Sequence, residues 1–92
     1  MTYRRLVTRI VDGDTFEIGN PIQGFYRVRL ARVRASELNT TGGQRAKNVL
    51  RGLIGGANVT IQVVAKSYGR VVAEVYHYGR NINDIMRSKG YR

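Results

Sequence analysis

Apolar and polar residues alternate in several short stretches of this chain, a pattern typical of β-strands with one buried face. The clearest stretch covers residues 25–33, where apolar side chains alternate with basic ones and Arg27 and Arg29 share a face. Turn-forming pairs such as Asp12-Gly13 and Tyr68-Gly69 separate neighbouring stretches, as expected for hairpins. The pattern therefore predicts five strands, over residues 6–11, 15–18, 25–33, 59–64 and 70–78.

A longer apolar spacing, with repeats after three or four residues, predicts two helices. The first covers residues 44–54, where a preceding threonine can cap the helix and two glycines follow its last residue. The second is shorter, covers residues 81–89 and stops at Gly90. Three basic residues, Arg45, Lys47 and Arg51, fall outside the apolar face of the first helix. The residues predicted to point inward are Ala46, Val49, Leu50, Leu53 and Ile54, and in the second helix Ile82, Ile85 and Met86.

Three strands, a helix, two strands and a closing helix follow the element order of an OB-type barrel. We therefore predict a mainly β (α+β) fold, namely a five-stranded OB-type barrel with one helix between strands 3 and 4 and a short C-terminal helix. Ninety-two residues supply one modest core, so residues 1–92 are expected to form a single domain.

The net charge of +10 indicates the kind of partner. A field of that strength attracts polyanions and makes their binding sensitive to salt. Only three of the 16 basic residues are lysines, and guanidinium groups suit bidentate phosphate contacts. Nucleic acid, single-stranded DNA or RNA, is therefore the favoured partner. A cationic surface kept only for solubility is one alternative interpretation. Binding to a membrane surface is a second, which is disfavoured because no predicted helix is strongly amphipathic with one wholly basic face.

The composition and motifs exclude several other kinds of site and location. Cysteine is absent, which excludes disulfides and thiolate metal sites. No serine–histidine–acid arrangement, phosphate-binding glycine loop or zinc spacing is present. No apolar run approaches the ~20 residues of a membrane span, and no signal-peptide pattern opens the chain. A cytoplasmic location without membrane partners is therefore expected, and no pattern specifies an oligomeric state.

Three short motifs carry the candidate chemistry. The first is Asp12-Gly13-Asp14-Thr15, which alone would indicate an ordinary hairpin turn. The second pairs Arg29 with Glu37 eight residues later, and the third is Tyr68-Gly69-Arg70. With the surrounding pattern over residues 6–90, they resemble the staphylococcal nuclease-like (thermonuclease) family. That family has an OB-fold and hydrolyses phosphodiester bonds as calcium-dependent endonucleases.

The resemblance implies a role for each matching residue, although each alone would be interpreted as an ordinary surface or turn residue. Asp14 would be a metal ligand, joined by the backbone carbonyl of Ala35 in a calcium site. Arg29 and Arg70 would bind the phosphate and the charge that builds on it during attack. Glu37 would orient or deprotonate the attacking water.

Arg34 is the main departure from the family pattern. It stands where the family has its second metal-binding aspartate, and Ser36 stands where the family has proline. A cation there repels calcium, and a loss of even ~3 kcal/mol lowers affinity or rate about a hundredfold. An ion pair between Arg34 and Asp14, in the space of the metal, is one expected arrangement. Calcium binding is therefore expected to be weak or absent.

The sequence favours a nuclease-like domain that binds nucleic acid through a basic face, with hydrolysis weak or lost. Besides the catalytic set, Arg27, Arg34 and Tyr68 are expected to contact the nucleic acid, Tyr68 beside the nucleotide as the resemblance implies. One alternative is an active calcium-dependent endonuclease with water in place of the missing carboxylate. The other is a non-catalytic interaction module whose basic surface meets an acidic protein or ribosomal RNA. No base-reading motif distinguishes DNA from RNA.

Overall fold

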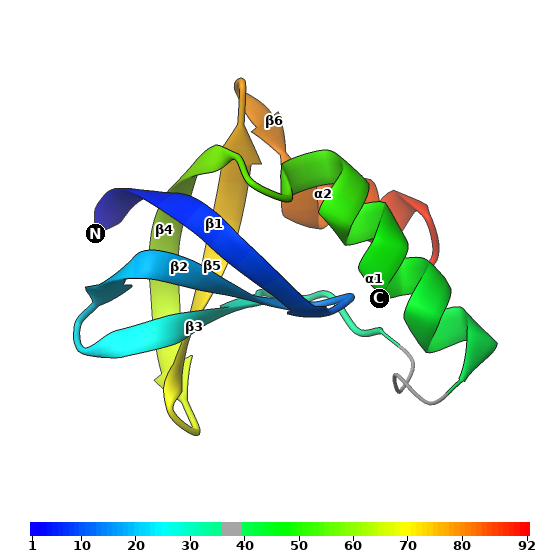
Figure 1. Ribbon diagram of the computed structural model, residues 1–92, viewed down its shortest axis with the longest axis horizontal. Coiled ribbons are helices and arrows are strands. Elements are labelled where there is room, and N and C mark those ends of the chain that lie inside the picture. Colours follow the sequence, from blue (N-terminus) through cyan, green and yellow to red (C-terminus); the bar gives the residue numbers. More distant parts are fainter. Residues whose placement is uncertain (36–39) are drawn as a thin grey trace.

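The computed structural model describes residues 1–35 and 40–92, which form a β-barrel with two helices at one end (Figure 1). Both helices lie on the side of the barrel where β1 runs into β2. The elements are β1 (Thr2–Asp12), β2 (Thr15–Ile22), β3 (Phe25–Leu30), α1 (Thr41–Ile54), β4 (Asn58–Ser67), β5 (Arg70–His77), β6 (Arg80–Asn81) and α2 (Ile82–Ser88).

Strand pairing closes the barrel. The strands lie in the order β3-β2-β1-β4-β5-β6, and neighbours in that order are antiparallel. β3 also pairs with β5 in parallel, with Val28 opposite Val71 and Leu30 opposite Ala73. This pairing joins the first and fifth strands of the order into a closed barrel. The predicted fold class, a mainly β chain with a five-stranded barrel and two helices in the expected places, is confirmed.

The apolar members of each alternating pattern fill the barrel. Phe16, Leu30 and Ile61 are fully buried, and burying one such side chain contributes roughly 1.5–3 kcal/mol. The helices add the inward residues that their spacing predicts, of which Ala46, Leu50, Ile54, Ile82 and Met86 are buried and Val49, Leu53 and Ile85 are partly buried. No helix in the described part of the chain is long and apolar enough to cross a membrane.

Several element boundaries differ from the prediction. β1 begins at Thr2, because residues Thr2 to Leu6 pair with β4. The side chains of this segment are exposed or only partly buried, so the sequence shows no clear alternation there. β3 ends at Leu30, because Arg32 adopts a left-handed backbone with φ 61° that does not continue a strand. The two-residue β6 was not predicted, since so short a strand has no periodicity.

Asn83 is a fully buried polar residue that ties α2 to the barrel. Its side-chain nitrogen donates to the carbonyl oxygens of Ala31 and Ala73, each at 2.9 Å. Its side-chain oxygen accepts from the backbone N–H of Val75, also at 2.9 Å. These bonds join α2 to β5 and to the segment that follows β3, which is the segment leading to Arg34.

Candidate functional site

The β1–β2 turn packs directly against α1. A Cβ added at Gly13 would lie 2.5 Å from the Cβ of Ala46 and 2.8 Å from the Cβ of Ala35. These separations are shorter than side-chain carbons tolerate, so only glycine lets the turn approach the helix this closely. The turn, and Asp14 with it, is therefore held between α1 and the segment after β3.

Asp14 follows this turn and is bound by neighbouring groups on both carboxylate oxygens. The Thr15 hydroxyl donates to Oδ1 at 2.9 Å, and the backbone N–H of Ala35 donates to Oδ2 at 3.4 Å. The Asp14 backbone carbonyl accepts from the N–H of Leu30 at 2.8 Å. Only 15% of the Asp14 side chain is exposed. The structure therefore brings Asp14 and Ala35 together through the backbone N–H of Ala35, and the metal-ligand role of its carbonyl stays a prediction.

Arg29 lies beside Asp14 and has a second set of contacts. Its Nη2 is 3.8 Å from Oδ2 of Asp14, and a quarter of its side chain is exposed. The guanidinium also donates to the carbonyl oxygens of Leu30, at 3.2 Å, and Val33, at 3.1 Å. Arg29 therefore holds the segment after β3 in place, and its side chain remains partly exposed.

Arg70 and Tyr68 lie at the hairpin between β4 and β5. Tyr68 and Gly69 both have positive φ, 51° and 77°, the type I′ geometry that suits a two-residue hairpin. Tyr68 is 96% exposed at this turn. The Nε atom of Arg70 is buried and has no hydrogen-bond partner in the described part of the chain. An N–H group in that situation is unusual and costs roughly 1–3 kcal/mol.

Arg27 and Arg34, two further expected nucleic-acid contacts, are both exposed. Arg27 donates to Glu17 at 3.1 Å. The backbone N–H of Arg34 donates to the carbonyl of Tyr91 at 3.3 Å. The expected ion pair between Arg34 and Asp14 is not found, since no ion pair within 4 Å links Arg34 to a carboxylate among residues 1–35 and 40–92. Asp14 pairs with Arg29 instead, because Arg29 projects from the strand that the turn contacts.

Asp12 has a closer relation to Asp14 than the sequence indicated. Its Oδ1 accepts from the backbone N–H of Asp14 at 3.0 Å. Partial burial raises the pKa of Asp12 above its ordinary value, and a side-chain hydrogen bond with Asp14 and the charge of that carboxylate raise it further. The two carboxylates of the Asp-Gly-Asp motif therefore share one site.

Replacing Asp12 by asparagine is expected to stabilise the domain at neutral pH. A carboxyl whose pKa is raised by folding destabilises the fold as the pH rises through that pKa, because its charged form is the disfavoured one. Asparagine keeps the oxygen that accepts from Asp14 and does not ionise. The variant should melt at a higher temperature at pH 7, with the difference shrinking as the pH falls toward 3.8, the ordinary value of the Asp12 carboxyl. A difference that does not change with pH would contradict this interpretation.

The described residues do not form a complete calcium shell. Calcium takes six to eight oxygen ligands, usually including several carboxylates. No group of three or more acidic or histidine side chains suitable for a metal occurs within residues 1–35 and 40–92. Both oxygens of Asp14 already accept hydrogen bonds, and Arg29 lies near one of them. Glu37, the expected water-binding residue, and Ser36 lie outside the described residues.

Comparison with known proteins places this site in context. The family model for the staphylococcal nuclease homologue matches residues 27–92. Endonuclease YhcR of Bacillus subtilis (strain 168) is 30% identical over 105 aligned positions, which cover 97% of this chain and 9% of the relative. An uncharacterized endonuclease of Haemophilus influenzae (strain ATCC 51907 / DSM 11121 / KW20 / Rd) is 35% identical over 85 positions, which cover 91% of this chain and 48% of the relative. The chain thus spans less than half the length of either relative.

Proposed function

Because the chain belongs to the staphylococcal nuclease homologue family, we propose that it binds single-stranded DNA or RNA and that its phosphodiester hydrolysis is weak or lost. One observation carries the binding proposal, namely the buried Nε of Arg70, which has no hydrogen-bond partner among the described residues. A phosphate oxygen is an acceptor of the right charge for that group.

The positions of Arg29 and Arg70 support a shared phosphate site. Val28 and Val71 are opposite each other in the parallel β3–β5 pair, and both are buried. Arg70 directly precedes this pair of residues and Arg29 directly follows it, so both arginines project from the outer face of adjacent strands. Two guanidinium groups on neighbouring strands suit the non-bridging oxygens of one phosphodiester.

The same proposal gives roles to the other residues predicted to contact nucleic acid or water. Tyr68 is fully available for stacking on a base, which is worth roughly 1–3 kcal/mol per base. Arg27 and Arg34 are exposed cations that extend the contact with the backbone of the nucleic acid. Glu37 would orient the attacking water, a role that rests on its spacing from Arg29 in the sequence.

The donor groups present support the proposal that hydrolysis is weak. A bound divalent cation supplies a polarised water and neutralises charge on the phosphate. Here Arg34 stands in place of a carboxylate ligand, and the described residues offer Asp14, with Asp12 next to it and the carbonyl of Ala35. This set fits a strong calcium site poorly, so we propose that binding of nucleic acid outweighs its cleavage.

An active calcium-dependent endonuclease is the second candidate function. It is favoured by the exposed position of Arg34, which forms no ion pair with Asp14 among the described residues. The closeness of Asp12 to Asp14 favours it too, because two neighbouring carboxylates attract a cation more strongly than one.

The test measures cleavage of one labelled single-stranded oligonucleotide at low salt, with calcium and with chelator, and binding of the same oligonucleotide at low and at high salt. We expect Arg70→Ala to weaken binding about tenfold or more, because it removes the buried donor, while Arg80→Ala on β6 changes affinity less than threefold. We expect little or no cleavage by the native protein. Rapid calcium-dependent cleavage that disappears in Glu37→Ala would support the endonuclease instead. Binding that is insensitive to salt would contradict both and indicate an interaction module.

A further inference from the structure

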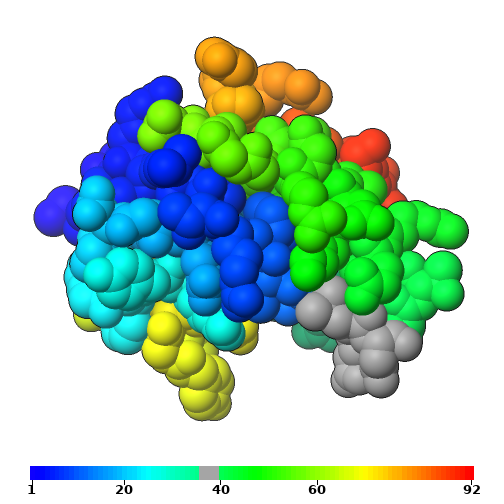
Figure 2. Space-filling model, viewed as in Figure 1, coloured from blue at the N-terminus to red at the C-terminus, as the bar shows by residue number. Residues whose placement is uncertain are grey.

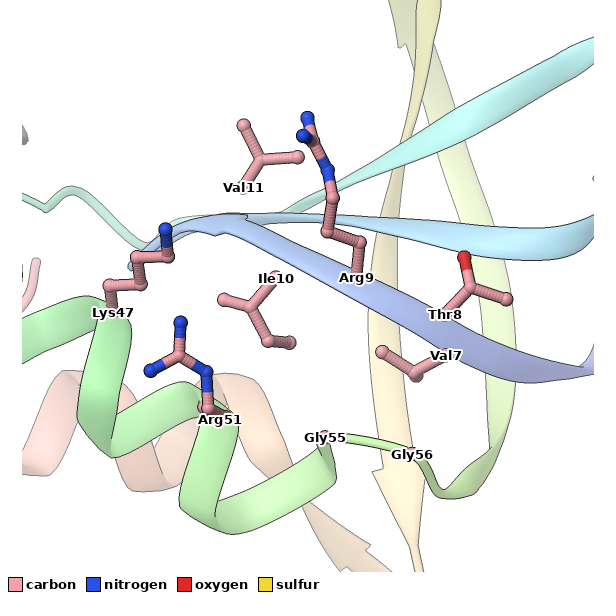
Figure 3. Close-up of a pocket in the computed structure, with 9 residues that line it drawn as sticks. All are labelled: Val7, Thr8, Arg9, Ile10, Val11, Lys47, Arg51, Gly55 and Gly56. Carbon is pink, nitrogen blue, oxygen red and sulfur yellow. The ribbon is translucent and has the colours of Figure 1, made fainter.

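A groove separate from the Asp14–Arg29 pair runs between β1 and α1 (Figure 3). Its volume is about 710 Å³, within the range of sites that hold nucleotide-sized ligands. Figure 2 shows the same face, with β1 directly beside α1. The lining residues are Val7, Thr8, Arg9, Ile10 and Val11 from β1, and Lys47, Arg51, Gly55 and Gly56 from α1 and the residues after it.

Among the described residues that line this groove, three are cations and none is a carboxylate. Arg9 shares Glu17 with Arg27, since both arginines lie 3.1 Å from a Glu17 oxygen. Neither Lys47 nor Arg51 forms an ion pair in the described part of the chain, and Arg51 donates only to the neutral Asn48, at 2.9 Å. Two cations without an ion pair among the described residues, beside a third that shares one carboxylate, favour an anionic occupant.

The walls between these cations are mainly apolar, and one end of the groove is formed by glycines. Ile10 forms part of the floor, and Figure 3 shows the head groups of Lys47 and Arg51 rising from α1 beside it. Gly55 and Gly56 leave one end open. A nucleic-acid strand suits this arrangement, because its phosphates can contact the cationic head groups while its sugars or bases contact the apolar floor. A free inorganic anion would contact only the cations.

The groove adjoins the site already described. Its lining ends at Val11 on β1, one residue before Asp12, and at Lys47 on α1. Lys47 is next to Ala46, the residue on which Gly13 packs. The groove and the Asp14–Arg29 pair therefore flank the same β1–β2 turn. A ligand that extends beyond the first site in this direction meets Lys47 and Arg51.

We propose that the groove between β1 and α1, through Lys47 and Arg51 with Arg9 opposite, binds backbone phosphates of the nucleic-acid strand outside the Arg29–Arg70 site. This inference rests on the proposed function and adds to it a second contact region along the strand. The occupant is a polynucleotide, because its phosphates repeat along a chain and so reach the groove and the first site together.

The test uses a fluorescein-labelled 15-nucleotide single strand in chelator, with anisotropy measured from 50 to 200 mM salt. The variant Lys47→Gln/Arg51→Gln keeps good helix formers and removes both charges. It should bind about tenfold more weakly at 50 mM salt. The slope of log affinity against log salt should fall by about 1.4, because each phosphate contact to a single strand contributes ~0.7. The control Arg45→Gln/Lys89→Gln removes the same two charge types outside the groove and should change the affinity less than threefold.

The outcomes separate this inference from the proposed function. If Arg70→Ala weakens binding but the groove variant behaves like its control, the groove proposal is wrong and the proposed function stands. If the native protein does not bind the oligonucleotide, both are wrong. If a polyglutamate peptide binds through Lys47 and Arg51 while oligonucleotide binding is unaffected by their loss, the groove serves an acidic protein and the proposal is also overturned. Unchanged melting temperatures for both double variants show that the fold is intact.

Discussion

Arg34→Asp is expected to tighten calcium binding by about a hundredfold. The substitution removes a positive charge and adds a carboxylate at the position that the resemblance to the family assigns to its second ligand. A change of ~3 kcal/mol in the interaction with a divalent cation corresponds to that factor, after screening and side-chain motion reduce the full Coulomb energy. Isothermal titration calorimetry with calcium, on the native protein and the variant at the same ionic strength, measures it.

The control variant Arg80→Asp makes the same change of charge on the two-residue β6 and should leave calcium affinity nearly unchanged. It distinguishes an effect of net charge from direct coordination of calcium by a new carboxylate. Cleavage of the oligonucleotide should rise with calcium affinity in Arg34→Asp and should disappear again in Arg34→Asp/Glu37→Ala. Equal calcium affinity in the native protein and Arg34→Asp would show that position 34 does not correspond to the ligand position of the family.

Asn83→Ala is expected to lower the free energy of unfolding by about 2–4 kcal/mol. The substitution leaves the N–H of Val75 and the carbonyl of Ala31 without their buried partner, and each loss costs roughly 1–3 kcal/mol. The carbonyl of Ala73 still accepts a hydrogen bond from the N–H of Ala31 at 2.9 Å, so losing its bond from Asn83 costs less. Urea denaturation at neutral pH measures the change.

The control for this prediction is Asn58→Ala, because Asn58 is exposed at the start of β4 and its side chain forms no hydrogen bond within residues 1–35 and 40–92. Its effect should stay within about 0.5 kcal/mol. Because Asn83 bonds to the segment leading to Arg34, its loss should also weaken oligonucleotide binding at temperatures where the variant remains folded. A change in stability below about 1 kcal/mol would show that α2 is held mainly by Ile82 and Met86.

Local patterning predicted most of the fold. Alternation identified five strands, and the three- and four-residue spacing identified the buried side of α1, because both periods follow directly from backbone geometry. Boundaries were less accurate, as at Thr2 and Leu30, because strand ends depend on pairing partners distant in the chain. The role of Asn83 could not be predicted for the same reason. The residues around it in the sequence do not indicate that its side chain is buried and bonded to three backbone groups of other segments.

For the site, the motifs identified Asp14 and Arg29, and the structure places their side chains 3.8 Å apart. The expected pairing of Arg34 with Asp14 was not found, because residue type does not determine which way a side chain projects from a segment between elements. Lys47 and Arg51 were assigned only to the polar side of a helix. Their place in a groove depends on β1, which lies more than thirty residues earlier in the chain.

The sequence by itself determined the five barrel strands and two helices in outline, the net charge and the identity of the motifs, because each depends on residue types and on spacing within one short segment. The tertiary structure alone decided which of those segments meet. The parallel β3–β5 pair brings Arg29 and Arg70 to adjacent strands, and the absence of a side chain at Gly13 lets the Asp14 turn contact α1. Distances between elements follow from barrel closure and close packing, which involve the whole chain at once.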